Sequence, residues 1–287
     1  MPLTLAPPSL AAKFDAWVAP PNAEVAVEFA AGRLSAGRGE RVGVVELAPA
    51  AVAPSAVRPN LADPEALTAS LRGLLEACAG IGTEVALLVP DLTARVSVLD
   101  FDRLPPRRDE HAALARFRLR KSLPFAEDQA VVSTQPLSPT RLLVAVAERA
   151  RLDEYENCLE AAGAHAATVL PSGLACLAAD PVLNHAALLI RAEQGSLTTA
   201  FCWSERLDFF RVIEVQSAVT FEDIFPSVAF FRDRVEAAAI SQPTLYAAGL
   251  GAELESRLRD EIPWATLRVA PSPGELAVAG ALRGRFL

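Results

Sequence analysis

Signatures of common nucleotide-binding and metal-binding sites are missing from this sequence of 287 residues. It contains no GxxxxGK[ST] loop, and Gly37-Arg38-Gly39 lies in a polar turn rather than in a GxGxxG loop that opens a helix. The four cysteines form no CxxC pair and have no histidine at ligand spacing, so they are expected to be small buried hydrophobes in a reducing compartment. Walker-type and Rossmann-type sites and a metal centre are therefore not expected.

The sequence also lacks signals for secretion or membrane insertion. Residues 1–22 have no basic segment before an apolar run, and two Pro-Pro pairs interrupt any helix there, so an exposed arm is expected. The uncharged stretch 161–179 is interrupted by glycine, proline and polar residues. The net charge of −8 argues against a general attraction to nucleic acid or anionic lipid, so any positive site must be local.

Three short strands separated by turns are predicted twice along the chain. In residues 23–47, Val25, Val27 and Phe29 alternate with other residues, and glycine-containing turns separate this strand from two more. Residues 186–215 repeat the plan, with strands expected at 188–190, 197–203 and 207–215. Two antiparallel meanders predict two similar lobes. An accidental likeness between two meanders is the alternative.

The middle of the chain predicts a smaller α+β unit, followed by a helix over 153–162. Strands are expected at 84–90, 95–99, 131–135 and 142–147, with a helix beginning near Asp109. That helix has Ala115 and Leu119 on one side and Leu114 and Phe117 on nearly the opposite side. One apolar side can cover a sheet. The other needs a second neighbour, either internal core or a partner peptide.

Part of the chain carries a resemblance to a known family, namely the segment RFRLRKSLPF at 116–125 together with residues 87–91, 95–101 and 104–105. This part resembles the inserted subdomain of the PilM family, the actin-like cytoplasmic proteins of type IV pilus assembly. The resemblance extends to both meanders and to residues 170–173, 224–239 and 245–249. It implies an α/β fold of the actin-like, ribonuclease H-like type, with two lobes, an inserted α+β subdomain and a reduced second lobe. The cytoplasmic domain of the type II secretion protein GspL is a close competitor.

The resemblance also implies a division of the chain. The expected parts are an N-terminal arm at 1–22, a first lobe at 23–83 and 151–185, the inserted subdomain at 84–150 and the second lobe at 186–287. The second lobe is expected to be reduced, because residues 215–244 have room for little beyond one helix. Family members place a larger subdomain there.

The positions that hold ATP in actin-like ATPases are altered in this sequence. Those proteins end the first strand of each lobe with Asp followed by Gly and hydroxyl residues, which approach the phosphates and hold the water shell of Mg²⁺. Here Glu28 lacks its glycine, and Phe29 and Ala30 would crowd the loop. We therefore expect a degenerate nucleotide site that has no catalytic residue and holds no metal or cofactor. MgATP would bind there only if the altered site could still hold a nucleotide. Its positions would be Glu28, Gly32, Glu193, Gly195, Gly249 and Gly251.

The function implied by the resemblance is that of a cytoplasmic scaffold in type IV pilus assembly, held at the inner membrane by a partner. That partner would be the N-terminal cytoplasmic tail of a PilN-like membrane protein, bound extended in a groove between the first lobe and the insert. The alternative is that the segment 116–125 does not contact a partner. Residues 123–125 would then only end the helix and fill the core, and the basic side chains of the segment would bond carboxylates within the protein. The candidates for lining or shaping the groove are Phe117, Arg118, Lys121, Leu123, Pro124 and Phe125.

Other expectations follow from the same resemblance. Contacts with the pilus motor ATPase and a homo-oligomer or ring are consistent with it, whereas nucleic acid binding and direct membrane insertion are not expected. The competing functions are a GspL-like component of type II secretion, an actin-like ATPase that uses Glu28 or Glu193 for Mg²⁺, and a self-assembling filament protein.

Overall fold

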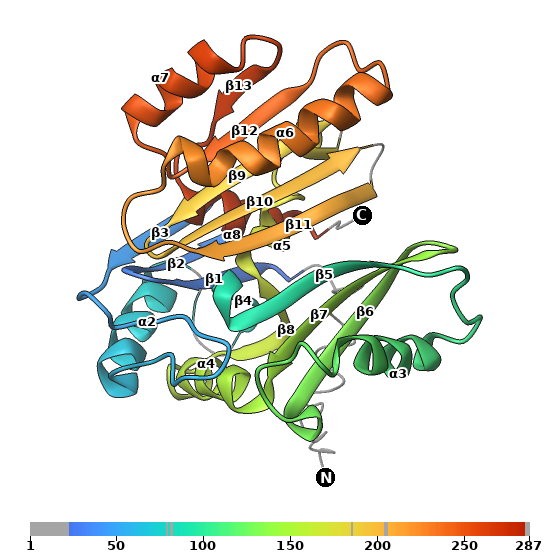
Figure 1. The fold of residues 1–287 in the computed structure, drawn as a ribbon. Coiled ribbons are helices and arrows are strands. Elements are labelled where there is room, and N and C mark those ends of the chain that lie inside the picture. Colours follow the sequence, from blue (N-terminus) through green and yellow to red (C-terminus); the bar gives the residue numbers. More distant parts are fainter. Residues whose placement is uncertain (1–22, 79, 81–82, 185, 204–205, 285–287) are drawn as a thin grey trace.

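The computed structural model describes residues 23–78, 80, 83–184, 186–203 and 206–284 of the chain. The arm expected at 1–22 lies outside the described residues. Two large sheets and a smaller three-stranded sheet make up the framework (Figure 1).

The first sheet begins with the predicted meander. β1 (Val25–Ala30) pairs antiparallel with β2 (Arg33–Arg38), and β2 pairs antiparallel with β3 (Arg41–Glu46). β1 also pairs in parallel with β4 (Glu84–Val89), and β4 with β8 (His165–Pro171), which gives the order β3-β2-β1-β4-β8. The boundary expected at residue 84 therefore differs from the structure, because β4 is the parallel partner of β1 in the first sheet and the insert follows it.

The second sheet repeats this order. β9 (Ala187–Glu193), β10 (Ser196–Trp203) and β11 (Arg206–Glu214) form the second meander, and β9 pairs in parallel with β12 (Thr244–Ala248). β12 pairs in parallel with β13 (Thr266–Val269), so the order is β11-β10-β9-β12-β13. Two sheets with the same strand order and the same directions are the duplicated framework of the actin-like fold, and the predicted fold class is confirmed.

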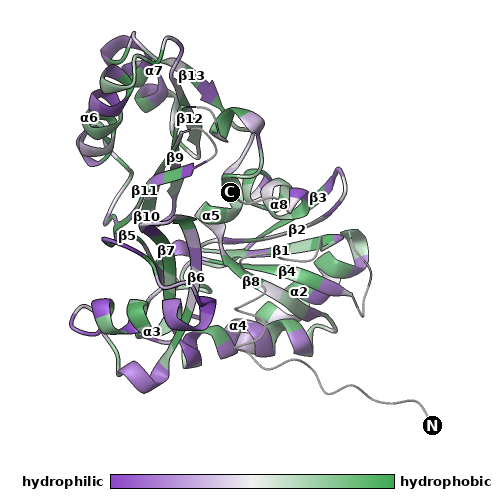
Figure 2. Ribbon diagram, turned by 90° about the vertical axis from the view of Figure 1, so that its right-hand side faces the viewer, coloured by the Kyte–Doolittle hydropathy of each residue, from purple (hydrophilic) through white to green (hydrophobic). Residues whose placement is uncertain are grey.

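The helices form three layers around these two sheets. α2 (Pro64–Cys78) and α4 (Arg149–Ala161) cover the outer side of the first sheet, and α6 (Phe221–Ala237) and α7 (Ala252–Glu261) cover the outer side of the second. α5 (Ser172–Cys176) and α8 (Pro273–Arg283) lie in the angle between the sheets (Figure 2). Since both faces of the first sheet are covered, β1 is buried along its whole length and does not alternate in burial.

One hydrophobic core runs through the middle of the molecule. It includes Val27 of the first sheet, Leu174 of α5, Leu276 of α8 and Leu189 of the second sheet. A separate cluster fills the space between the second sheet and α6 and α7, with Phe201 and Phe231 in contact at a ring-centroid distance of 4.9 Å. The two lobes are therefore packed against each other through shared apolar side chains.

The inserted subdomain is an antiparallel sheet with one helix. β5 (Ala94–Asp100), β7 (Arg141–Glu148) and β6 (Ala130–Ser138) follow in the order β5-β7-β6, and α3 (Arg108–Leu119) packs on β6. Short 3₁₀ turns lie at η2 (Asp91–Thr93), at η3 (Glu127–Gln129) and at η4 (Pro181–Asn184), between α5 and β9. β5 lies beside β11 of the second lobe, where Arg141 Nη1 is 2.6 Å from Asp208 Oδ1.

The connection from β11 to β12 holds the single helix α6, as the sequence predicted. A capping box at Thr220 begins this helix: the Thr220 backbone donates to the carboxylate of Asp223, whose own backbone N–H donates to the Thr220 hydroxyl. None of the helices in the described part of the chain has the length and apolar character needed to cross a bilayer.

Candidate functional site between the lobes

Two equivalent turns meet between the lobes. The turn after β1 contains Gly32, and the turn after β9 contains Gln194 and Gly195. Both glycines have positive φ angles, 83° and 82°, which a residue with a Cβ atom adopts only with strain. A Cβ atom on Gly32 would lie 2.8 Å from Oε1 of Gln194. The first-lobe turn therefore touches the second-lobe turn directly.

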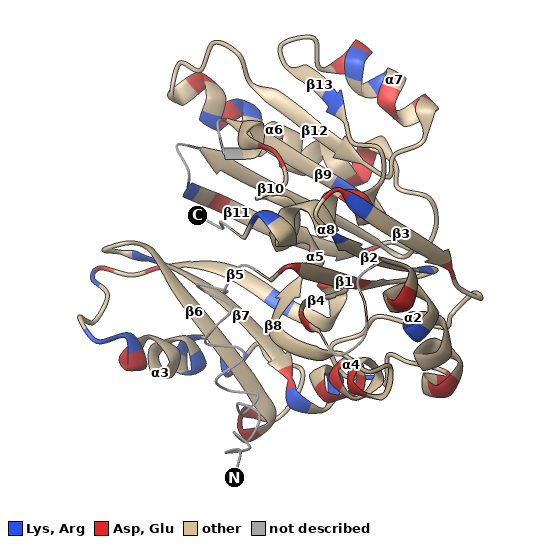
Figure 3. Cartoon of the chain, turned by 180° about the vertical axis from the view of Figure 1, so that it is seen from behind, with Lys and Arg blue, Asp and Glu red and all other residues tan. Residues whose placement is uncertain are grey.

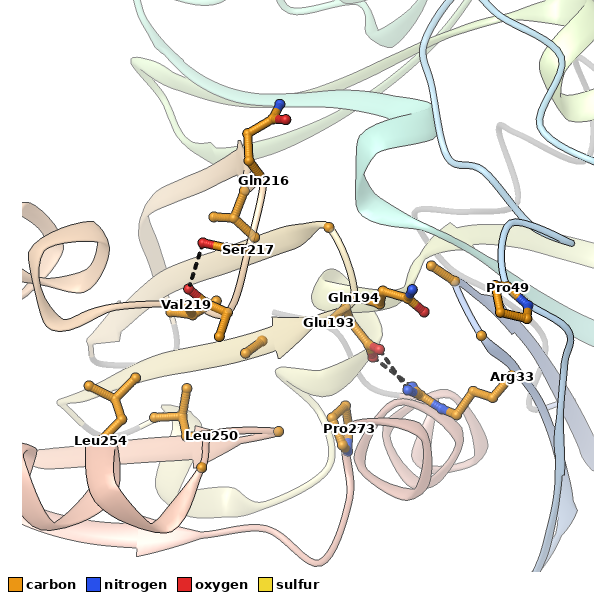
Figure 4. A pocket seen from close by; sticks show the side chains of 18 of the residues that line it. Arg33, Pro49, Glu193, Gln194, Gln216, Ser217, Val219, Leu250, Leu254 and Pro273 are labelled. Carbon is orange, nitrogen blue, oxygen red and sulfur yellow. Dashed lines mark hydrogen bonds and ion pairs between the residues drawn. The ribbon is translucent and has the colours of Figure 1, made fainter.

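A bidentate ion pair joins the two lobes at this point. Arg33, the first residue of β2, donates from Nη1 and Nη2 to the two carboxylate oxygens of Glu193, each at 2.6 Å (Figure 4). Arg33 Nη2 also lies 3.0 Å from Oε2 of Glu28. One guanidinium thus holds a carboxylate of β1 and the carboxylate at the end of β9.

A second arginine lies deeper, at the centre of the cluster. Arg191 on β9 is 2% exposed, and its Nη2 lies 2.5 Å from a carboxylate oxygen of Glu28 and 2.5 Å from one of Glu193. Its Nη1 is 3.3 Å from Oδ2 of Asp91. Glu28, Arg33, Asp91, Arg191 and Glu193 form what we call the interlobe ion cluster.

Asp91 ties the cluster to both lobes. It follows β4 in the first lobe, and it accepts a hydrogen bond of 2.6 Å from the hydroxyl of Thr198 on β10. The backbone N–H of Gly173, at the start of α5, donates to its other oxygen at 2.7 Å. A Cβ atom on Gly173 would lie 2.6 Å from that carboxylate, so the glycine allows the close approach.

The cluster has three carboxyl groups for two guanidinium groups. Burial raises the pKa of Glu28 above its ordinary value, although Arg191 and Arg33 oppose the rise. Burial likewise raises the pKa of Asp91 against the effect of Arg191. For Glu193 burial also favours the protonated form, but Arg191 and Arg33 outweigh it and hold the pKa below its ordinary value. Uptake of one proton by Glu28 or Asp91 leaves a cluster without net charge.

An open cleft of about 910 Å³ lies beside the cluster (Figure 4). Its walls come from both turns, from residues 215–219 and from the segment after β12, where Gly249 has a φ angle of 76° and packs against Ala192. Among the described lining residues, the only cationic side chain is that of Arg33, which is already paired with Glu28 and Glu193. No grouping of His, Cys, Asp and Glu suited to a metal ion was found among the described residues.

The structure brings together the positions expected for the degenerate nucleotide site. Gly32, Glu193, Gly195, Gly249 and Gly251 all line the cleft, and Glu28 lies fully buried beneath it. Sequence reasoning missed Arg33, Asp91 and Arg191, although an arginine inside the apolar run of β9 is a signal that a buried partner exists. Ser172, the first residue of α5, donates its hydroxyl to the carbonyl of Val89 at 3.2 Å.

The six residues expected at a peptide groove lie at one end of the insert. Arg95 Nη1 donates to the carbonyl of Ser122 at 2.7 Å, and Arg116 Nη1 donates to that of Ala130 at 3.0 Å. These bonds fix the end of α3 near the first residues of β5 and β6, where the insert joins the first lobe. Leu123 and Phe125 are half-buried against the insert's own core, and the other four are exposed: Phe117, Arg118, Lys121 and Pro124.

No protein-family model and no curated protein sequence matches this chain. Among solved structures, the chain is similar to one of the "PilM-PilN type IV pilus biogenesis complex", with 16% identity over 92% of this chain and 99% of that chain and a TM-score of 0.69. It is also similar to the cytoplasmic domain of EpsL, an inner membrane component of the type II secretion system of Vibrio cholerae, with 14% identity over 91% of this chain and 95% of that chain and a TM-score of 0.57. The resemblance to PilM predicted from the sequence is therefore confirmed at the level of the fold.

Proposed function

We propose that this protein is an actin-like scaffold of a type IV pilus or related secretion machinery and that it no longer uses ATP. The likeness to PilM extends over almost the full length of both chains, which supports the first part of the proposal. The single observation that carries the second part is the interlobe ion cluster. Protein side chains there provide the contacts between the lobes that phosphates and Mg²⁺ provide in an actin-like ATPase.

The residues of the cluster do not fit a magnesium nucleotide. A phosphate group needs donors that are free to turn towards it, but Arg33 and Arg191 already bond three carboxylates between them. A carboxylate that holds the water shell of Mg²⁺ needs access to the cleft, whereas Glu28 is 0% exposed and bonds two arginines. Binding MgATP would require breaking buried ion pairs, which is costly.

The scaffold role requires a site for a partner, and the end of the insert next to the first lobe is our candidate. In the PilM–PilN complex a chain with this fold assembles with PilN. Here Leu123 and Phe125 are anchored in the insert core, so they would shape a groove wall, and the exposed Phe117, Arg118, Lys121 and Pro124 would form its rim. An extended tail with apolar anchors fits such a border between a helix and a sheet.

Two titrations test the two parts separately. Calorimetric titration and thermal shift with MgATP are expected to show neither heat nor stabilisation, whereas a ligand at 100 times its Kd would add about 2.7 kcal/mol. Saturable binding would overturn the loss of ATP use and restore the ATPase alternative.

The second titration uses the N-terminal cytoplasmic peptide of the PilN-like protein from the same genome. We expect saturable binding that Phe117→Asp weakens, because a carboxylate at the rim opposes apolar contact. Arg268→Asp, an exposed change on β13 in the other lobe, is the matched control. Absence of peptide binding, with binding instead to a type II secretion component, would favour the GspL-like alternative. Contacts with a motor ATPase and self-assembly stay predictions.

A further inference from the structure

We propose that the α3 side of the inserted subdomain is a docking surface for a membrane that contains anionic phospholipids. The proposal depends on three observations about this side of the insert: its local charge, the lack of internal partners for that charge, and an exposed aromatic ring among the cations.

The first observation is a local excess of positive charge. Residues 103–125 contain seven cationic side chains and two acidic ones, although the whole chain has a net charge of −8. Basic residues lie in the loop before α3 and at the end of the helix (Figure 3). A basic patch on an otherwise acidic protein orients that protein towards an anionic surface, because the rest of the molecule is repelled by it.

The second observation is that most of these cations form no ion pair within the described chain. Arg107 is paired with Asp109 and Glu110, and Arg116 bonds a backbone carbonyl. The remaining five are exposed, and none has an ion pair with a described residue: Arg103, Arg108, Arg118, Arg120 and Lys121. The exposed carboxylates of Asp102, Glu127 and Asp128 lie in the flanking segments and form no ion pair with them either. The charge of the five cations is therefore available to an external partner.

The third observation is the position of Phe117. Its side chain is 63% exposed, and the guanidinium of Arg120 lies 4.6 Å from the centre of its ring. Ala115 and Leu119 on the opposite side of α3 are buried against the insert sheet, so the helix keeps its shape when its outer side is used. An aromatic ring between cationic side chains suits the lipid headgroup region, where the ring enters the apolar boundary and the cations meet phosphates.

These observations favour a bilayer over an acidic protein segment. An acidic peptide without apolar residues would pair with the cations but would leave Phe117 exposed, whereas a bilayer satisfies both. This inference rests on the proposed function in one respect, since a membrane-anchored tail bound at the same end of the insert would bring the patch to the lipid surface. A few cations give a weak, salt-sensitive attraction, which suits a contact that orients an already tethered protein.

Co-sedimentation of the full chain with vesicles tests the proposal. The vesicles contain either phosphatidylcholine alone or equal parts of phosphatidylcholine and phosphatidylglycerol, and no tail peptide is present. We expect binding only to the anionic vesicles at low salt, with release at about 0.5 M NaCl. The double variant Arg118→Glu with Lys121→Glu should bind at least about tenfold more weakly. Phe117→Ser should also weaken binding.

A charge-matched variant makes the outcome specific. Arg41→Glu with Arg268→Glu changes the net charge equally, at exposed cations of the two lobes that have no ion pair with a described residue, and should keep normal vesicle binding. Equal binding by both double variants, or no binding to anionic vesicles at low salt, would overturn the proposal. So would binding of a polyglutamate peptide to this surface without any vesicle binding, which would indicate a protein partner. The vesicle assay contains no tail peptide. The result of the vesicle assay therefore does not depend on whether the tail binds in the separate titration, and the two proposals can fail independently.

Discussion

Arg33 and Glu193, 160 positions apart in the sequence, are joined by two parallel hydrogen bonds of 2.6 Å across the cleft between the lobes. Together with Arg191, this pair joins the two turns. The bonds are partly or fully removed from water, so they are stronger and less sensitive to salt than ion pairs on the surface.

Removal of the central cation should strongly destabilise the protein. Arg191→Met leaves Glu28 and Asp91 buried without their shared partner, and we expect the free energy of unfolding to fall by about 3–5 kcal/mol. Urea denaturation measures the change. Arg259→Ala, which breaks an exposed i,i+4 pair with Glu255, is the control and should cost about 0.5 kcal/mol or less. A similar small loss for both variants would contradict the central role of Arg191.

Stability should depend on pH in two opposite ways. The folded chain holds protons on Glu28 and Asp91 more tightly than the unfolded chain, since their pKa values are raised. Stability from these groups is present at acidic pH and is lost as pH rises from the ordinary carboxyl values through the raised ones. The lowered pKa of Glu193 acts in the other direction, so its contribution is present above the ordinary carboxyl pKa of 4.5 and is lost as pH falls through the folded value.

The variant Glu28→Gln separates these two effects. It removes one of the groups with a raised pKa, so the fall in thermal midpoint between the ordinary carboxyl pKa and neutral pH should become shallower. Thermal midpoints measured across the pH range check this, with Glu253→Gln on the exposed side of α7 as the control. A Glu28→Gln profile that follows the wild-type profile over this range would show that Glu28 keeps an ordinary affinity for protons.

The contact between α5 and α8 should tolerate no added side chain. A Cβ atom on Gly280 would lie 1.9 Å from the carbonyl oxygen of Ala175, which is backbone and cannot rotate away. Gly280→Ala should therefore lower the free energy of unfolding by about 1–3 kcal/mol or more. Gly73→Ala in α2, where nothing lies within 4 Å, should instead stabilise the protein by up to about 1 kcal/mol. Destabilisation of equal size in both variants would contradict this explanation, because it would mean that the close contact between Gly280 and Ala175 has no effect of its own.

The insert should loosen from the second lobe when Arg141 is removed. Its guanidinium bonds the side chain and the carbonyl of Asp208 at 2.6 and 2.9 Å and the side chain of Asp100 at 2.9 Å. Arg141→Ala should speed amide hydrogen exchange in β5 and β11 and cost about 1.5–3 kcal/mol. Arg38→Ala, which removes an exposed pair with Glu24, should leave exchange in those strands unchanged. Unchanged exchange in the Arg141 variant would mean that the apolar contacts alone hold β5 against β11.

Local sequence patterns predicted the framework but not the site. Gly32 and Gly195 mark turns between alternating runs, so both meanders could be located, and the short span before β12 correctly indicated one helix. Val25, Val27 and Phe29 alternate with other residues in β1, yet the whole strand is buried, because α8, far along the chain, covers the other face of the sheet. Burial by a distant element leaves no local periodicity to detect.

The ion cluster depends on contacts between residues 100 or more positions apart. Arg191 lies 163 positions from Glu28 and 100 from Asp91, so the spacing of charges along the sequence does not indicate which pairs form. The prediction that the nucleotide site is altered depended on what is missing after Glu28. In the structure Glu28 bonds two arginines, Arg33 and Arg191, and Arg191 also bonds Asp91 in the segment that enters the insert.

The position of α8 has a consequence for the order of events during synthesis. This helix follows every strand of both sheets in the sequence, yet it packs against β1, β2 and β4 at the beginning of the first lobe. While a ribosome is still making the second lobe, the inner face of the first sheet has no cover, and apolar residues such as Ala26 and Leu88 are open to chaperones or to other nascent chains. The first lobe therefore completes its folding only after residue 283 has left the exit tunnel, so the molecule matures as a whole and not lobe by lobe.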